Sequence, residues 1–179
     1  MRLTPIGQND RSWAKVKAEW KAAADRTGED FSTLATGALV FLEPLSLLEG
    51  PKSGLYGYYE EDEVRAVCQI GRILISRHPS PVVRVRFITI SPLCDTGTLD
   101  LAAYAQLMVS LFSGVVWLAR TSLETRIIQF HLRSPSDAQY FAALQVAAPL
   151  SPFSRFSIKG SWIECILKNE IVTGTAGGG

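Results

Sequence analysis

Cysteine and histidine are both scarce in this chain of 179 residues, which has three cysteines and two histidines. Cys68, Cys94 and Cys165 lie far apart, form no Cys-x-x-Cys pair and are odd in number. This pattern argues against a disulfide framework and against a structural zinc site, and it is typical of a reducing compartment. We therefore expect neither a metal site nor a disulfide bond.

A net charge of one sign is also missing, because the formal charge at pH 7 is only +1. Such a chain has no overall field that would attract nucleic acid or an anionic membrane. The one basic cluster lies near the start of the chain and also carries Glu19 and Asp25, so we interpret it as a solvated helix face. Its cations are Arg11, Lys15, Lys17, Lys21 and Arg26. No specific nucleic-acid partner is expected.

Several well-known catalytic signatures are absent from the sequence. There is no P-loop, no Gly-x-Ser-x-Gly elbow, no His-Glu-x-x-His motif and no recognition-helix pattern. The first residues, MRLTPIGQNDRSW, lack the apolar core of a signal peptide. The expected location is therefore the cytoplasm, in keeping with the cysteine pattern, with a virion as the alternative.

Residues 101–119 form the longest stretch without charge, and its length would suffice to cross a bilayer. Its polar or small positions recur at helical spacing, which leaves one broad apolar face. The polar stripe is Gln106, Ser110, Ser113 and Trp117, and the apolar face is Leu101, Leu107, Met108, Leu111, Val115 and Leu118. We interpret the segment as a core helix packed on a sheet, with membrane contact as the less favoured alternative.

Apolar residues make up 47% and charged residues 20% of the chain, which predicts one folded domain. MRLTPI is a possible first strand, and a helix capped by Asn9 or Asp10 follows it to about Arg26, with Gly28 ending it. A second helix is expected over 32–42. The next segment, 54–76, is typical of two strands joined by an acidic turn at Glu60–Glu63.

A third consecutive strand is predicted in VVRVRFITI, where Val83, Val85 and Phe87 alternate with Arg84 and Arg86. The long helix to about Arg120 comes next, then a strand in RIIQFHL and a short helix in SPSDAQYFAALQ. FSRFSIKG and SWIECILK are typical of a closing hairpin. We expect a single domain over 1–168 and a Gly/Thr-rich tail over 169–179, which lacks the residues for a core of its own.

The order of these elements resembles the GNAT N-acetyltransferase fold over residues 1–168. Locally, YYEEDEVRAV is similar to the acidic turn between that family's second and third strands, and RVRFITISP is similar to its fourth strand leading to a long helix. The resemblance implies an α+β (mixed) fold, with a mostly antiparallel central sheet and helices on both faces.

The family's diagnostic motif would lie in ISPLCDTGTLD, residues 90–100. There an Arg or Gln and a Gly-x-Gly or Gly-x-Ala open the helix, so that free N–H groups and the helix dipole bind the coenzyme's pyrophosphate. This chain has Asp95 near the expected Arg or Gln, retains only Gly97, and adds Asp100. An aspartate satisfies a helix N-terminus as a phosphate does, so a self-capped helix start with Thr98 as cap is the favoured interpretation. Ile90, Gly97 and Thr98 are the candidate cofactor-binding residues.

The resemblance also implies where catalytic groups would lie. A tyrosine on the family's fourth helix often protonates the departing thiolate, and Tyr140 lies on the matching segment, about one turn early. His131 lies in a strand near the place where a base would face the cleft. For both residues, ordinary packing is the competing interpretation.

Two main functions follow from the resemblance and the altered motif. The favoured one is a GNAT-like domain without catalysis that needs no cofactor and serves in assembly, as in internal virion proteins of some short-tailed phages. Its expected partners are proteins or further copies of the chain, bound through the C-terminal tail. The alternative is an acetyl-CoA-dependent N-acyltransferase with an atypical pyrophosphate loop. A third hypothesis, a membrane-active protein, requires insertion of the 99–120 helix.

Overall fold

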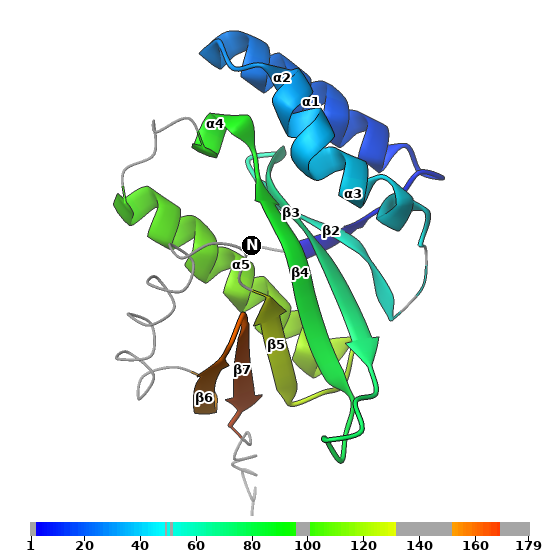
Figure 1. The fold of residues 1–179 in the computed structure, drawn as a ribbon, viewed down its shortest axis with the longest axis vertical. Helices are drawn as coiled ribbons and strands as arrows, with labels where there is room; N and C mark the ends of the chain where they lie inside the picture. The colour runs from blue at the N-terminus through cyan, green and yellow to red at the C-terminus, as the bar shows by residue number, and fades with distance from the viewer. Residues whose placement is uncertain (1–2, 49, 51, 96–100, 132–151, 169–179) are drawn as a thin grey trace, which may run out of the picture.

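The computed structural model of the chain describes residues 3–48, 50, 52–95, 101–131 and 152–168 (Figure 1). These residues form one sheet in the order β1-β2-β3-β4-β5-β7-β6. All neighbouring strands are antiparallel except β4 and β5, which run parallel. The strands are β1 (Leu3–Ile6), β2 (Ser53–Glu60), β3 (Glu63–Ile73), β4 (Val82–Ile90), β5 (Ile127–His131), β6 (Phe153–Lys159) and β7 (Trp162–Leu167).

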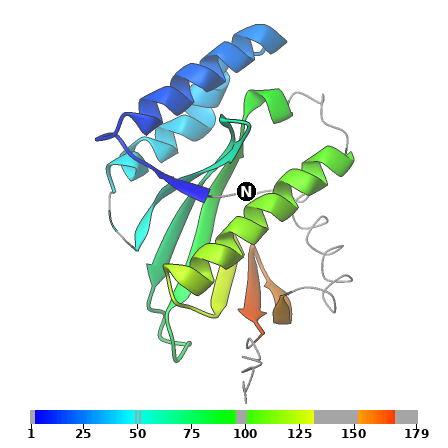
Figure 2. The ribbon, with the colours of Figure 1, turned by 180° about the vertical axis from the view of Figure 1, so that it is seen from behind.

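Helices cover both faces of this sheet, as the resemblance to the GNAT fold implies. The long helix α5 (Leu101–Thr121) runs behind the sheet in Figure 1 and in front of it in Figure 2. The other helices are α1 (Ser12–Thr27), α2 (Phe31–Leu34), the π-helix η1 (Ala35–Leu39), α3 (Val40–Leu42), the 3-10 helix η2 (Pro44–Leu47) and α4 (Pro92–Asp95). The α1–η2 segment packs on β2, β3 and β4 across the sheet from α5. The fold is thus a mixed α+β architecture with a mostly antiparallel sheet.

Helix α5 contributes the apolar face that its periodicity predicts. Leu111, Val115 and Ala119 are fully buried in the cluster that also contains Val83, Val85 and Ile128 of the sheet. The polar stripe is predicted correctly for Gln106, Ser113 and Trp117, which are exposed, but Ser110 is buried. By length and composition Ala102–Thr121 is the one helix of the described residues that could cross a membrane, with a mean hydropathy of 1.6, and 56% of it is buried in the fold.

Helix α1 also buries the predicted face, comprising Trp13, Val16, Trp20 and Ala24. The indole of Trp20 donates to the backbone oxygen of Val64 on β3 at 2.8 Å, which ties the helix to the sheet. Gly28 ends the helix in the left-handed conformation with φ 75°. At the other end the N-cap position falls on Arg11, while the predicted Asp10 accepts from the Ser12 amide at 2.9 Å.

The segment predicted as a second helix is helical but not uniform. Asp30 caps α2 by accepting from the Ser32 amide at 2.9 Å, and the chain then widens into a π-helical turn at Ala35–Leu39 before α3. Gly37 lies within this turn, where glycine weakens the ordinary α-helical preference. The helical run 31–42 agrees with the predicted extent, and the π turn is what the sequence pattern missed.

The acidic turn between β2 and β3 is confirmed. Glu61 and Asp62 both have positive φ, at 48° and 65°, as the two central residues of a tight hairpin turn require. The predicted strands at 82–90, 127–131 and 153–167 are also present. The predicted helix around Tyr140 and the tail from 169 lie outside the described residues.

Candidate functional site

Within the described residues, which stop at His131 in β5, the ladder between β4 and β5 covers the first half of β4. Val82–Val85 pair in parallel with Ile127–Phe130, whereas β4 continues to Ile90. Over Arg86–Ile90 no described strand covers the side of β4 that faces away from β3, and Figure 1 shows β4 extending upward past the end of β5. We call this side of Arg86–Ile90 the uncovered edge of β4. A strand edge of this kind can accept another extended segment by main-chain pairing.

A β-bulge lies at the start of the uncovered edge. The β3–β4 register shifts between Val67 and Gln69, and Phe87 there has a φ of 51°. Phe87 therefore packs with the α1–η2 cluster, while Ile88 and Ile90 pack in the α5 cluster. The predicted alternation that placed Phe87 with Val83 and Val85 is thus wrong, because the extra residue reverses the sides. Bulges commonly redirect groups beside binding sites.

Ile90 ends β4, and the backbone beyond it turns back on itself. The Ser91 amide donates to the Arg65 oxygen of β3 at 2.9 Å, and the Cys94 amide donates to the Ser91 oxygen at 2.8 Å within α4. Since successive amides of a strand point to opposite edges, the amide of Ile90 points toward the uncovered edge. Gly97, Thr98 and Asp100 lie outside the described residues, as does the predicted cap of the long helix, so these remain predictions.

A pocket of about 410 Å³ adjoins Ile90. Phe31, Leu34 and Gly37 line one side of it, and Ile90 and Pro92 line the other. The π-helical turn of η1 forms part of its wall, and such turns often occur at functional sites.

The rim of this pocket is acidic. Glu29 and Asp30 both line it. A hydrogen bond from the Ser32 hydroxyl, and a second from the Ser32 amide, lower the pKa of Asp30. Asp30, which is ionised and caps α2, lies beside this largely apolar pocket. The pocket would therefore favour a ligand with a cationic end over a ligand with an anionic end.

His131 is the last residue of β5 and lies where the β4–β5 ladder ends. It is half-buried, and its ring centroid is 4.7 Å from that of Trp162, its cross-strand partner on β7. The structure confirms that His131 lies in a strand, and its role as a base stays a prediction. Tyr140, the other catalytic candidate, lies outside the described residues.

A row of polar side chains crosses the sheet on the face opposite α5. Arg84 of β4 pairs with Gln129 of β5, Gln129 with Glu164 of β7, and Glu164 with Ser157 of β6. Gln129 accepts from Arg84 Nε at 3.0 Å and donates to Glu164 Oε2 at 2.7 Å. We call these four residues the polar row.

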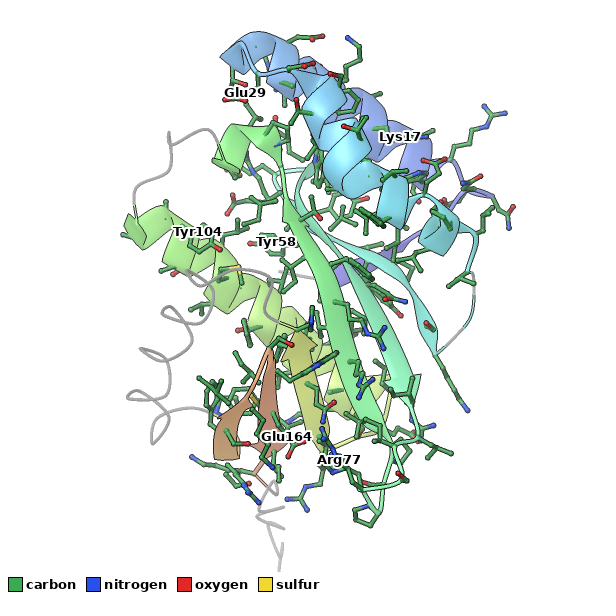
Figure 3. The ribbon with its side chains drawn as sticks, viewed as in Figure 1. Lys17, Glu29, Tyr58, Arg77, Tyr104 and Glu164 are labelled. Atoms are coloured by element: carbon green, nitrogen blue, oxygen red, sulfur yellow. The ribbon has the colours of Figure 1, made fainter. Side chains whose placement is uncertain are left out.

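The hairpin before β4 adds two cationic or polar side chains to Glu164. The Glu164 carboxylate lies 3.0 Å from His78 Nε2 and 3.8 Å from an Arg77 guanidinium nitrogen, and Figure 3 shows Arg77 and Glu164 together at the lower end of the sheet. Burial alone would raise the pKa of Glu164. The hydrogen bond from Gln129 and the charges of His78, Lys159 and Arg77 outweigh burial, so the pKa lies below its ordinary value.

Sequence reasoning missed the polar row. Its signal is a single polar residue in the middle of an apolar strand, Gln129 in IIQFH and Glu164 in WIECIL. Buried polar groups of this kind need partners, but the sequence does not show that these strands would be neighbours.

The cysteines have no features of nucleophiles or metal ligands. All three are buried and free, and burial raises the pKa of Cys68 and of Cys165 to about 12. Within the described part of the chain, no three His, Cys, Asp or Glu side chains come together as a metal site would require.

Solved structures share this architecture. A probable acetyltransferase from Staphylococcus epidermidis is 12% identical, with 93% of this chain and 96% of that chain covered and a TM-score of 0.51. An N-acetyltransferase from Campylobacter jejuni is 12% identical over 85% of this chain and 90% of that chain, with a TM-score of 0.46. An N-acetyltransferase from Staphylococcus aureus is 10% identical over 93% and 94%, with a TM-score of 0.43.

No protein-family model matches the chain, and no curated protein matches it in sequence. The structural likeness defines the class: this is a protein with a GNAT-like fold. The fold predicted for this chain is therefore confirmed, and function has to be argued from its own residues.

Proposed function

We propose that this chain binds an acyl-coenzyme A thioester along the uncovered edge of β4 and transfers the acyl group to an amine. The observation that supports the proposal is that β4 continues over Arg86–Ile90 beyond the described β4–β5 ladder, with no described neighbour on one side. This is the alternative of the two functions weighed from the sequence. The support for this function comes from the strand pairing in the sheet, which does not depend on the altered loop motif.

The ligand and the uncovered edge match in chemistry. The pantetheine arm of coenzyme A is an extended chain with two amide groups, which can pair with a strand edge as an added strand would. The Ile90 amide points to this edge, and the bulge at Phe87 changes which backbone groups face it. When bound, the coenzyme supplies the activated thioester.

The chain's own residues would bind and orient the acceptor. His131 lies at the end of β5 beside the uncovered edge, where it can accept the proton that an attacking amine releases. The apolar pocket with the acidic rim of Glu29 and Asp30 fits an amine carried on an apolar group. The acidic side chains Asp95 and Asp100 disfavour tight binding of the pyrophosphate, so the strand edge would carry more of the affinity than usual.

Thermal unfolding of the full chain with acetyl-CoA tests the proposal. A ligand present at 100 times its dissociation constant adds about 2.7 kcal/mol of stability, which corresponds to a rise in Tm of roughly 5–10 °C for a domain of this size. The substitution Ile90→Pro removes the amide that points to the uncovered edge, and the rise should disappear. The matched variant Ile90→Val keeps the amide and should show the full rise.

The second candidate is the non-catalytic assembly function, including the virion setting and binding through residues 169–179. It is favoured by the two aspartates in the loop and by exposed apolar side chains that a partner could cover. These are Val40, Phe41, Leu47 and Leu48, with exposed fractions of 53%, 56%, 65% and 50%. This function predicts no change of Tm with millimolar acetyl-CoA, and multimers by light scattering that are lost when residues 170–179 are deleted.

A further inference from the structure

Several cationic side chains gather beside the polar row on the sheet face opposite α5. Arg77 and Lys159 lie near the carboxylate of Glu164, and Arg77 and Arg86 lie near the guanidinium of Arg84. Arg84 shows the effect of this crowding, because burial and then the charges of Arg86 and Arg77 lower the pKa of its guanidinium. Like charges held together cost folding free energy, which a bound anion would offset.

Trp162 is at the centre of these groups. The guanidinium carbon of Arg84 lies 4.7 Å from the centroid of the Trp162 ring system, and that of Arg86 lies 5.8 Å from it. His131 and Lys159 are the cross-strand neighbours of Trp162 on β5 and β6. The indole therefore supports two guanidinium groups from a rigid strand, as stacking between Arg and Trp does elsewhere.

The polar row holds Arg84 in place through its Nε, while the other guanidinium N–H groups of Arg84 can still donate to a ligand. Arg84 gives its Nε to Gln129, which Glu164 holds in turn. Among the described residues, neither Arg84 nor Arg86 has a carboxylate within ion-pair distance. Both side chains are only half-buried. Guanidinium groups in this state bind the oxygens of a carboxylate or phosphate through paired N–H donors.

We propose that Arg84, Arg86 and Trp162 form a binding site for the oxyanion of an acceptor molecule, a carboxylate or phosphate group on the same molecule as the reacting amine. That it is the acceptor's group rests on the proposed function; that the site binds an anion does not. The site lies beside His131, at the end of the β4–β5 ladder, where an acceptor would meet the thioester. It is on the face opposite α5, so it is separate from the N-terminal end of α5 where the resemblance implies coenzyme phosphates.

Titration of the ¹⁵N-labelled full chain with inorganic phosphate and, separately, with sodium acetate at constant ionic strength tests the site. The indole N–H resonance of Trp162 should shift and saturate with at least one anion, and the tighter of the two identifies the group as phosphoryl or carboxylate. Arg86→Gln should weaken binding at least about tenfold, the size expected for losing a hydrogen bond to a charged group. Arg86→Lys keeps the positive charge but loses the paired N–H donors of the guanidinium. Its affinity for the anion should therefore lie between that of the wild type and that of Arg86→Gln.

Arg26→Gln is the matched control, because it removes the same charge from an exposed position in the last turn of α1 and should bind as the wild type does. No saturable shift with either anion, or equal affinity in Arg86→Gln and wild type, would overturn the site. Acetyl-CoA that competes with phosphate for the Trp162 shift would assign these arginines to the coenzyme and overturn the acceptor assignment. Anion binding without any acetyl-CoA stabilisation would leave the site standing and reject the proposed function instead.

Discussion

Glu164 is a carboxylate held in a mostly buried position by neighbours from three parts of the chain. Its side chain is 10% exposed and accepts from Gln129, with His78 and Arg77 also close. Removing its charge weakens the hydrogen bond from Gln129 and the attraction to His78 and Arg77, and a hydrogen bond to a charged group contributes about 1.5–3 kcal/mol. The residue therefore links stability to pH.

We predict that Glu164→Gln lowers the free energy of unfolding by about 1–3 kcal/mol at pH 7. The pKa of Glu164 is lower in the folded chain than in the unfolded chain, so its stabilisation is fully present above the unfolded pKa and is lost as the pH falls through the folded pKa. Urea unfolding at pH 7 and at successively lower pH should show the gap between variant and wild type narrowing.

Glu60→Gln serves as the control at the same pH values. Glu60 is 52% exposed in its pair with Arg65 at 3.3 Å, and an exposed pair contributes about 0–1 kcal/mol. A Glu164→Gln variant as stable as Glu60→Gln at pH 7, or a gap that widens on acidification, would contradict the role given to the polar row.

Some candidate residues can be placed from local sequence, whereas others come together only through the tertiary structure. The sequence places His131 in a strand, because a strand is a local property of the chain. The sequence does not bring Arg84, Gln129 and Glu164 together, because they form a row only when β7 inserts between β5 and β6. That strand order is set by packing across the whole sheet.

At the scale of elements, helix boundaries follow residue chemistry closely. Gly28 ends α1 because its left-handed φ of 75° suits glycine and strains other residues. In strand β4, Phe87 adopts a φ of 51° at a bulge without being glycine. The predicted alternation fails there because an inserted residue in one strand is invisible in a period-two pattern.

Two alanine substitutions at glycines should have opposite effects on stability. At both Gly28 and Gly37 an added Cβ would meet no atom within 4 Å, so only the backbone decides. Gly28→Ala should destabilise by about 1–2 kcal/mol because of the left-handed φ. Gly37→Ala should stabilise by up to about 1 kcal/mol, as expected within a helix. Urea denaturation measures both, and effects of the same sign would contradict the assigned backbone conformations.

At the scale of the whole molecule, the sheet has two faces, each packed against helices. Helix α5 covers one, the α1–η2 segment covers part of the other, and the uncovered edge of β4 lies at the border between the polar row and the pocket at Ile90 (Figures 1 and 2). The separate elements could be predicted because each segment carries its own periodicity, and their order resembles the GNAT fold, which implied this architecture. The uncovered edge could not be predicted, since it depends on how two strands distant in sequence pair in the described part of the sheet.

Hydrogen exchange along β4 tests the central claim most directly. With saturating acetyl-CoA, the amides of Ile88 and Ile90, which by alternation point to the uncovered edge, should exchange more slowly, while that of Ser91, bonded to Arg65, should not change. Unchanged exchange over residues 86–90 in the presence of millimolar acetyl-CoA would contradict the proposed acyl-CoA site.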